Sequence, residues 1–320
     1  MKQSDANSNA QRQAQLAEWK KHRALMERED FLNWRRGTNG YWFLRYKHQA
    51  VLLFGAFLKA TGFFKFGYRN ALDIHVRHRE VFLRALPETF NGYRILHLSD
   101  LHLDSIEGLG ESIAHIIAPL SYDLCVITGD FRTSRHGKHK QVLPPLCRIL
   151  SAVTASDGIY AVLGNHDTQA MYGDFDALGI HLLINQTISL TRSNQQVFLT
   201  GIDDPHDYYT EDATKCLEQP IDGFRILLAH SPEMYRIAAK NDFDLYLCGH
   251  AHGGQICLPG GLPLMTCLDT AKHLYKGMWH YKGMIGHTST GCGTAKIPVR
   301  FNCHPEITVL KLTRRETIRR

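Results

Sequence analysis

Residues 94–102 read RILHLSDLH, a short apolar run that ends in an aspartate and a histidine. The same arrangement, an apolar run followed by polar residues and often by glycine, returns five times along the chain. The later copies are LCVITGD (124–130), IYAVLGNHD (159–167), VFLTGIDD (197–204), RILLAHSPE (225–233) and LYLCGHAHGG (245–254). Runs rich in leucine and β-branched residues are typical of strands buried on both faces, and helical stretches separate several of them. The pattern predicts a layered α/β or αββα domain.

The polar residues that end these runs form one candidate site. Ligands of such sheets bind beyond the carboxyl ends of the strands, so a single sheet would bring these side chains to one edge. Each residue alone has an ordinary explanation, because an aspartate after a strand is often a helix N-cap and a histidine near a core is often simply hydrogen-bonded. Together, however, they would bury several acidic groups at one place, which is costly unless cations neutralise them. The set is Asp100, His102, Asp130, Asn165, His166, His230, His250 and His252.

The chemistry of these donors indicates transition metals. Imidazole nitrogen and carboxylate oxygen suit zinc, iron or manganese better than calcium, and no thiolate belongs to the set. The number of donors permits two ions, and two metals about 3.5–4 Å apart can clamp a phosphoryl group. Glycines beside the donors, such as Gly129, Gly164 and Gly249, allow tight turns and close approach of a phosphate. The sequence therefore predicts a two-metal site for phosphoryl chemistry.

The order of the motifs resembles that of the calcineurin-like metallophosphoesterases. Their five blocks correspond here to SDLH, TGDF, GNHD, AHSP and GHAH. The resemblance implies a hydrolase with a four-layer αββα sandwich over residues 91–320, preceded by a basic, aromatic-rich helical extension over residues 1–90. It also implies two divalent transition metal ions as cofactors, manganese, iron or zinc, with manganese favoured.

The same resemblance assigns roles to the site residues. Asp100, His102 and His252 would hold one ion, Asn165, His230 and His250 the other, and Asp130 would bridge the two. A metal-bridging hydroxide would attack phosphorus, His166 would contact the phosphate and protonate the leaving oxygen, and Asp167 would orient His166. One position departs from the family pattern, because Thr133 stands where a further acidic residue is common.

The segments GHAHGGQICLPGG and GCGTAKIPVRFNCHPEITVLKL resemble a branch of this family, the bacterial membrane-associated phosphoesterases of the YkuE and YaeI type. Some members of that branch are UDP-2,3-diacylglucosamine pyrophosphatases of lipid A synthesis. This implies a phosphodiester or pyrophosphate bond in a lipid-linked substrate. A soluble nucleotide or cyclic-nucleotide phosphodiesterase is the alternative, and a non-catalytic scaffold is a remote one against which the complete ligand set argues. The basic loop containing Arg132 and residues 135–140 either grips a second phosphate or is a solvated charged loop.

The positive charge of the chain is concentrated at its N-terminus. Residues 1–90 hold 16 Lys and Arg against 8 Asp and Glu, whereas the remainder holds 21 against 23. Residues 41–68 are rich in aromatic side chains, but their longest uncharged run, 49–58, is about half of the ~20 residues that span a bilayer. An interface-lying helix at a membrane surface is the favoured interpretation, and an aromatic hairpin packed on the main domain is the alternative. No nucleic-acid partner is expected, since the segment has no recognised reader motif.

The composition of the chain predicts its location in the cell. With 320 residues and 44% hydrophobic content the chain can bury a sizeable core. Its eight cysteines are scattered and form no CxxC pair, which suits a reducing compartment, and the polar first residues do not form a secretory signal. The expected location is cytoplasmic, with peripheral attachment to the cytoplasmic face of the inner membrane as the variant that the aromatic segment suggests.

Overall fold

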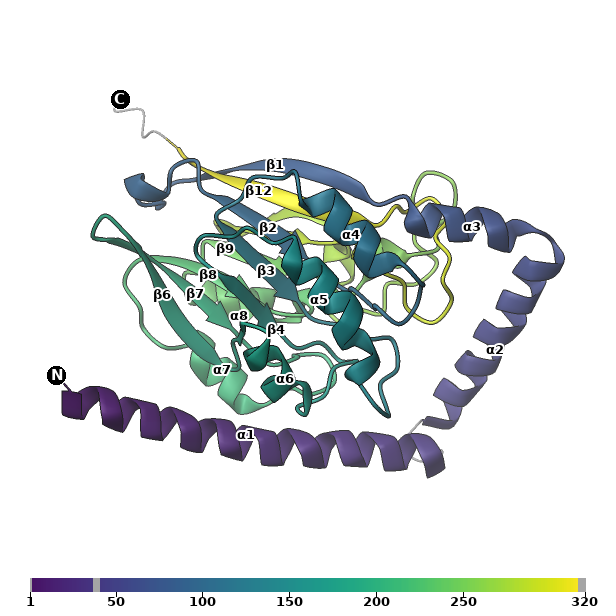
Figure 1. Cartoon of the computed structure of the whole chain (residues 1–320), viewed down its shortest axis with the longest axis horizontal. Coiled ribbons are helices and arrows are strands. Elements are labelled where there is room, and N and C mark those ends of the chain that lie inside the picture. Colours follow the sequence, from purple (N-terminus) through teal and green to yellow (C-terminus); the bar gives the residue numbers. More distant parts are fainter. Residues whose placement is uncertain (1, 37–40, 316–320) are drawn as a thin grey trace.

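Three helices open the chain. The computed structural model describes residues 2–36 and 41–315, beginning with α1 (Lys2–Arg36), α2 (Tyr41–Ala60) and α3 (Phe63–Leu72). In Figure 1, α1 runs along the lower edge of the molecule and α2 rises at the right edge to α3. Within the described ranges no single helix is long and apolar enough to cross a membrane. Gln49–Ala60 and Phe63–Leu72 have the required length and composition only together, and they are bent by 104°.

The first sheet has six strands in the order β1-β12-β2-β3-β4-β5. Strands β2 to β5 run parallel, β12 is antiparallel to β2, and β1 is parallel to β12. All five residues of β3 are buried, as expected for a strand covered on both faces. The bounds are β1 (His75–Leu83), β12 (Glu306–Arg314), β2 (Arg94–Leu98), β3 (Leu124–Thr128), β4 (Ile159–Val162) and β5 (Ile180–Leu182).

The second sheet also has six strands, in the order β10-β11-β9-β8-β7-β6. Its four central strands are parallel, while β10 and β6 are antiparallel to their neighbours. The bounds are β10 (Gly277–Tyr281), β11 (Met284–Thr288), β9 (Leu245–Cys248), β8 (Phe224–Leu228), β7 (Gln195–Gly201) and β6 (Gln186–Arg192).

Three apolar clusters hold four layers together. One lies between the sheets and joins residues such as Val126 of β3 to Leu228 of β8. A second packs α4 (Leu109–Ile117), α5 (Leu143–Ser151) and α6 (Met171–Ala177) on the first sheet, and a third packs α7 (Glu211–Leu217) and α8 (Tyr235–Lys240) on the second. The predicted αββα sandwich is therefore confirmed. Short 3-10 helices complete the elements: η1 (Glu88–Phe90), η2 (Lys140–Val142), η3 (Pro232–Met234), η4 (His252–Gly254) and η5 (Lys272–Leu274).

The start of the sandwich differs from the expectation that residues 1–90 form a helical extension before it. Strand β1 lies within these residues, yet it pairs along its whole length with β12 and so belongs to the first sheet. Periodicity missed this edge strand, because HVRHREVFL is mostly polar and five of its residues are charged or histidine before Val81. The segment 41–68 is also not one helix, since Gly62 adopts a left-handed φ of 79° where α2 and α3 meet.

Candidate metal centre

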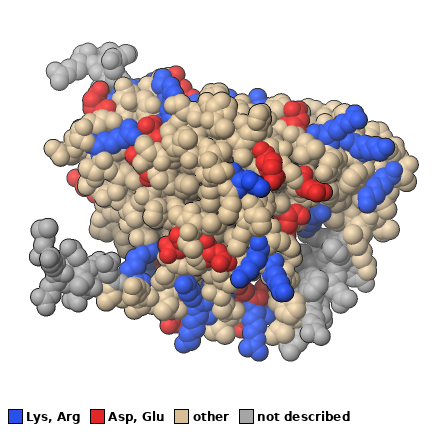
Figure 2. Space-filling model, in the orientation of Figure 1, with Lys and Arg blue, Asp and Glu red and all other residues tan. Residues whose placement is uncertain are grey.

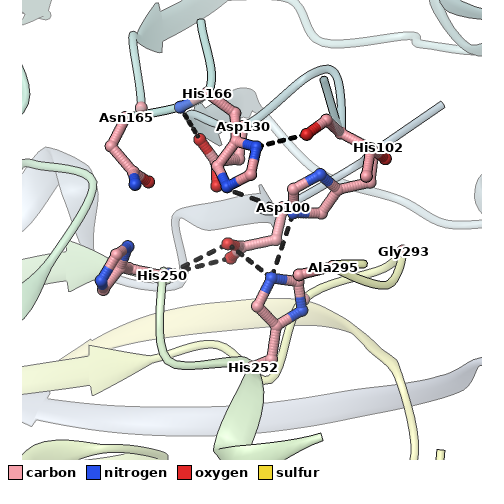
Figure 3. A network of polar contacts seen from close by, with 12 residues as sticks. Asp100, His102, Asp130, Asn165, His166, His250, His252, Gly293 and Ala295 are labelled. Carbon is pink, nitrogen blue, oxygen red and sulfur yellow. Dashed lines mark hydrogen bonds and ion pairs between the residues drawn. The ribbon is translucent and has the colours of Figure 1, made fainter. Parts of the chain in front are cut away.

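Five parallel strands, three from one sheet and two from the other, end at the candidate site. Asp100 and His102 follow β2, Asp130 follows β3, and Asn165 follows β4. His230 follows β8, and His250 and His252 follow β9. The expectation that one sheet would carry all of them was wrong, because both sheets of the sandwich contribute. Figure 3 shows the side chains converging from the two sheets.

The predicted ligands form two buried clusters that share Asp130. The first joins Asp100, His102, Asp130 and His252, and the second joins Asp130, His230 and His250. In the first, His252 Nε2 lies 3.1 Å from His102 Nε2 and 3.3 Å from Asp100 Oδ1. In the second, His230 Nε2 lies 3.3 Å from Asp130 Oδ2 and 3.2 Å from His250 Nδ1. Each cluster offers the nitrogen and oxygen donors that a divalent transition metal prefers.

The carboxamide of Asn165 is a second indication that this site binds a cation. Its amide nitrogen donates to Asp207 Oδ2 at 2.8 Å, while its Oδ1 is buried and accepts no hydrogen bond from the described residues. A buried acceptor without a partner is costly, and a cation beside it would satisfy it. The donor set therefore fits two divalent ions, with Asn165 beside the second cluster.

Backbone carbonyls orient three of the imidazoles. His102 Nδ1 lies 2.9 Å from Arg132 O, His230 Nδ1 2.7 Å from Thr128 O, and His250 Nε2 3.0 Å from Cys267 O. A ring nitrogen that donates to a carbonyl leaves the other nitrogen with its lone pair free for a metal. The three rings are thus set to present Nε2, Nε2 and Nδ1 to the centre.

Burial and neighbouring charges set the protonation of the cluster. Burial lowers the pKa of His250 and of His252 well below the ordinary value, so both rings are neutral and able to ligate. Burial acts in the same direction on His230, but the Asp130 carboxylate beside it outweighs burial and holds its pKa well above the ordinary value. Burial raises the pKa of Asp100. The site is an acidic pocket in which positive charge is strongly favoured.

The backbone is strained at five of the candidate ligands. Asp100, His102, Asp130, His250 and His252 have φ values of 48°, 41°, 57°, 72° and 49°. Non-glycine residues seldom adopt this left-handed region, and such residues cluster at functional sites where the surrounding structure enforces them. Two of the glycines in the motifs lie where the backbone comes close to a ligand, since a Cβ at Gly164 or Gly249 would overlap the Asp130 or Asp100 carboxylate. The loops are shaped around the two aspartates.

The contacts of His166 and Asp167 differ from the expected pair. His166 Nδ1 lies 2.5 Å from the carbonyl oxygen of Thr133, so that carbonyl, rather than Asp167, orients the ring. The Asp167 carboxylate accepts hydrogen bonds from the amides of Asp130, Phe131 and Gly164 at 2.8–2.9 Å. Asp167 therefore fixes the loop that carries the shared aspartate. Burial lowers the pKa of His166 to about 4.

The basic loop after Asp130 is engaged with the protein itself. Buried Arg132 donates to the carbonyls of His166, Gly137 and Arg135. Arg135 is paired with Asp207 at 2.5 Å and lies 3.9 Å from Asp30 of α1. These contacts favour a structural role for both arginines over the hypothesis that they grip a second phosphate.

Several residues that support the site were not singled out from the sequence. Asp203 and Asp207 follow β7, whose run VFLTGIDD had the same strand-end pattern as the ligands and was the available signal. Arg300 is fully buried and donates to the carbonyls of Thr290 at 2.7 Å and Gly293 at 2.6 Å, in the loop that packs on Asp100. Arg23 of α1 reaches the Gly164 carbonyl, and no local pattern marks it.

Comparison with known proteins agrees with this geometry. A family model described as calcineurin-like phosphoesterase matches residues 93–254. YkoQ, an uncharacterised metallophosphoesterase of Bacillus subtilis (strain 168), is 28% identical over 270 residues, which cover 81% of this chain and 96% of YkoQ. YkuE of the same organism, also an uncharacterised metallophosphoesterase, is 29% identical over 282 residues, covering 82% and 94% of the two chains. The phosphodiesterase YaeI of Escherichia coli (strain K12) is 29% identical over 255 residues, covering 74% and 87%.

Proposed function

The chain belongs to the family of calcineurin-like phosphoesterases, and from this premise we propose that it hydrolyses a phosphodiester or pyrophosphate bond of a lipid-linked substrate such as UDP-2,3-diacylglucosamine. The reaction class follows from the family and from the buried Asp and His clusters. Two bound divalent ions, with manganese as our first choice, would neutralise the phosphoryl oxygens and acidify the attacking water. The chain's own part is to hold the seven ligands in place and to present the His166 ring, 5.2 Å from that of His102, at the same centre.

The observation that carries the lipid proposal is an exposed apolar surface on α2, α3 and the loop 258–265. Leu53 is 72% exposed and Leu262 is 63% exposed, and exposed apolar side chains that gather in one patch mark interaction sites. Lys59, Lys65 and Arg69 are exposed on the same two helices, and basic residues beside aromatic ones favour anionic lipid. Figure 2 shows basic side chains over α3 at the right end of the molecule. We use the name apolar surface for the exposed apolar side chains of these segments, which are Leu52, Leu53, Phe57, Phe63, Phe66, Leu258, Leu262, Leu264 and Met265.

This apolar surface is joined to the metal centre through a short path. Gly67 of α3 lies against Phe301, and the Phe301 backbone bonds to Gln255 and Cys257. Those two residues lie just before the loop 258–265 and follow His252 within five positions. The loop returns to the site where Cys267 O meets His250. Under this proposal an acyl chain lies on the apolar surface and its phosphate group extends toward the metal centre.

Vesicle flotation tests the membrane part of the proposal. We expect the full chain to float with vesicles containing anionic phosphatidylglycerol, and the double variant Phe57→Glu/Phe63→Glu to stay in solution. Phe82→Glu is the matched control, because Phe82 is 54% exposed but lies on β1. Equal flotation of all three proteins, or of none, would contradict docking through α2 and α3.

Substrate assays test the chemical part. Manganese-loaded protein should hydrolyse bis-p-nitrophenyl phosphate and, with greater kcat/KM, UDP-2,3-diacylglucosamine presented in mixed micelles. Activity confined to soluble nucleotides or cyclic nucleotides would favour the alternative function and refute the lipid assignment.

A further inference from the structure

The N-terminal helix α1 is clamped to the metal centre by a fully buried arginine. Arg23 is 1% exposed, although it lies on a helix whose neighbouring residues Lys21, His22 and Arg28 are exposed. A buried guanidinium is expensive to desolvate and persists only where acceptors surround it. The acceptors around Arg23 are the Asp203 carboxylate and two backbone carbonyls of the loop that carries Asn165 and His166.

Arg23 holds both ends of the loop that carries Asn165 and His166. Its Nη2 donates to the carbonyl of Gly164 at 3.1 Å and to that of Asp167 at 3.2 Å. Its Nη1 donates to Asp203 Oδ1 at 2.7 Å, and its Cζ lies 3.5 Å from the ring centroid of Tyr208. The guanidinium therefore ties the four-residue turn 164–167 to the loop after β7.

Neighbours on the same face of α1 extend this clamp. Trp19 Nε1 donates to Asp203 Oδ2 at 2.7 Å, so α1 occupies both oxygens of that carboxylate. Glu27 accepts from Arg23 Nε at 3.1 Å, from Gln169 N at 2.8 Å and from Thr168 Oγ1 at 2.5 Å. Positions 19, 23 and 27 are spaced by four residues and lie on one helix face. The loop is thus fixed on both sides of its metal-facing residues.

A second path from α1 reaches Asn165 through side chains. Asp30 lies 3.9 Å from Arg135, which pairs with Asp207, and Asp207 accepts the Asn165 amide at 2.8 Å. The Asn165 amide nitrogen is occupied in this way, so its Oδ1 is turned to the side where it has no partner. Backbone and side-chain contacts from α1 thus act on the same residue.

We propose that Arg23 is a positioning residue for the hydrolytic reaction, and that α1 completes the metal centre by holding the 164–167 turn in its ligating conformation. The inference rests on the proposed phosphoesterase activity and is independent of the lipid assignment. Helix α1 also contacts α6, where Trp19 and Lys20 lie against Tyr172, and such contacts would be enough to anchor the helix. Anchoring alone does not require a buried guanidinium on the backbone of the loop that carries candidate ligands.

The test compares Arg23→Lys with Arg28→Lys in the full chain. Lysine keeps the charge opposite Asp203, but a single ammonium cannot reach that carboxylate and both carbonyls together. For Arg23→Lys we expect kcat for bis-p-nitrophenyl phosphate to fall about 10–100-fold with KM changed little, as when a group that supports metal ligands is lost. At a free manganese concentration that just fills both sites of the parent, manganese bound per chain should fall from two toward one, and amide exchange of residues 163–170 should accelerate. Arg28→Lys, on an exposed face of the same helix, should match the parent in all three measurements.

The outcomes separate positioning from simple anchoring. Lower thermal stability with unchanged kcat, metal content and exchange at 163–170 would show that Arg23 only anchors α1, and would overturn the proposal. If Arg23→Lys does not fold, Glu27→Gln replaces it, since this variant leaves the guanidinium in place and removes the negative charge of the carboxylate that accepts from Arg23 Nε. It should then give a smaller fall in kcat with the same faster exchange. If the parent protein hydrolyses no phosphodiester, the proposed function fails, while metal content and amide exchange still decide the role of Arg23.

Discussion

Gly164→Ala is the substitution that the geometry of the site predicts most sharply. An alanine Cβ at this position would overlap Asp130 Oδ1, lie 2.6 Å from Asp130 N and lie 2.9 Å from Asp130 Cγ. Ordinary contact begins at 3.4 Å, so the turn and the shared aspartate must separate by about 1 Å. A displacement of about 1 Å at a reacting centre lowers activity on the order of 100-fold, and forcing a methyl group into a packed site costs about 1–3 kcal/mol of stability.

Gly173→Ala provides the matched control for this substitution. A Cβ at Gly173 meets nothing within 4 Å, and the residue lies inside α6, where alanine is the better helix former by about 1 kcal/mol. We expect Gly173→Ala to be fully active and slightly more stable in urea denaturation, and Gly164→Ala to lose activity toward bis-p-nitrophenyl phosphate at saturating manganese. A Gly164→Ala protein that keeps at least half of the parent activity would refute the close packing of this turn on Asp130.

Three further predictions concern the metal centre and Asp244, a carboxylate before β9 that accepts a hydrogen bond from the Arg225 amide at 2.9 Å. Asp130→Asn removes the carboxylate that the two described clusters share, so metal analysis should find fewer than two ions per chain and kcat should fall on the order of 100-fold. Full metal content would argue against a shared ligand. Chelation with EDTA should lower the melting temperature and added manganese should restore it, because a ligand that binds only the folded state stabilises it; an unchanged melting curve would contradict a tightly held metal. Burial raises the pKa of Asp244 to about 6, so the folded state disfavours its ionised form, and this group's contribution to stability is lost as pH rises from about 4 to about 6. Asp244→Asn should flatten the pH dependence of urea stability across that window, and an identical slope in both proteins would disprove the assignment.

The sequence identified side chains that the structure brings together, because these candidate ligands lie at strand ends, where local pattern and topology coincide. An apolar run ending in Asp-x-His or Gly-Asp marks both the strand and the side chain beyond it, so Asp100, His102 and Asp130 could be placed without coordinates. The allocation to two sheets could not be predicted in this way, since apolar runs carry no information on which strands pair. The edge strand β1 was not predicted for a related reason, because its many polar residues obscure the alternation of apolar and polar positions that marks a strand.

The residues that hold the loops of the centre in place could not be identified from the sequence, because they act through contacts with residues far away in the chain. Arg23 and Gly164 are separated by 141 positions, and nothing around Arg23 distinguishes it from the exposed cations of the same helix. The orienting role given to Asp167 failed for the opposite reason. Adjacent residues in a tight turn seldom face one another, and the Asp167 carboxylate points back to the amides of Asp130, Phe131 and Gly164.

Membrane binding cannot be tested cleanly by removing residues 1–90. Residues before 91 contain the apolar surface of α2 and α3, but they also contain the edge strand β1 and the clamp residue Arg23. A protein beginning at residue 91 would leave β12 as an unpaired edge and the 164–167 turn without its buried cation. Loss of vesicle binding or of activity in such a truncation would not distinguish a missing membrane surface from a damaged centre. Substitutions at Phe57 and Phe63 alter only exposed side chains, so a loss of flotation with unchanged hydrolysis of a soluble diester can be attributed to the apolar surface alone.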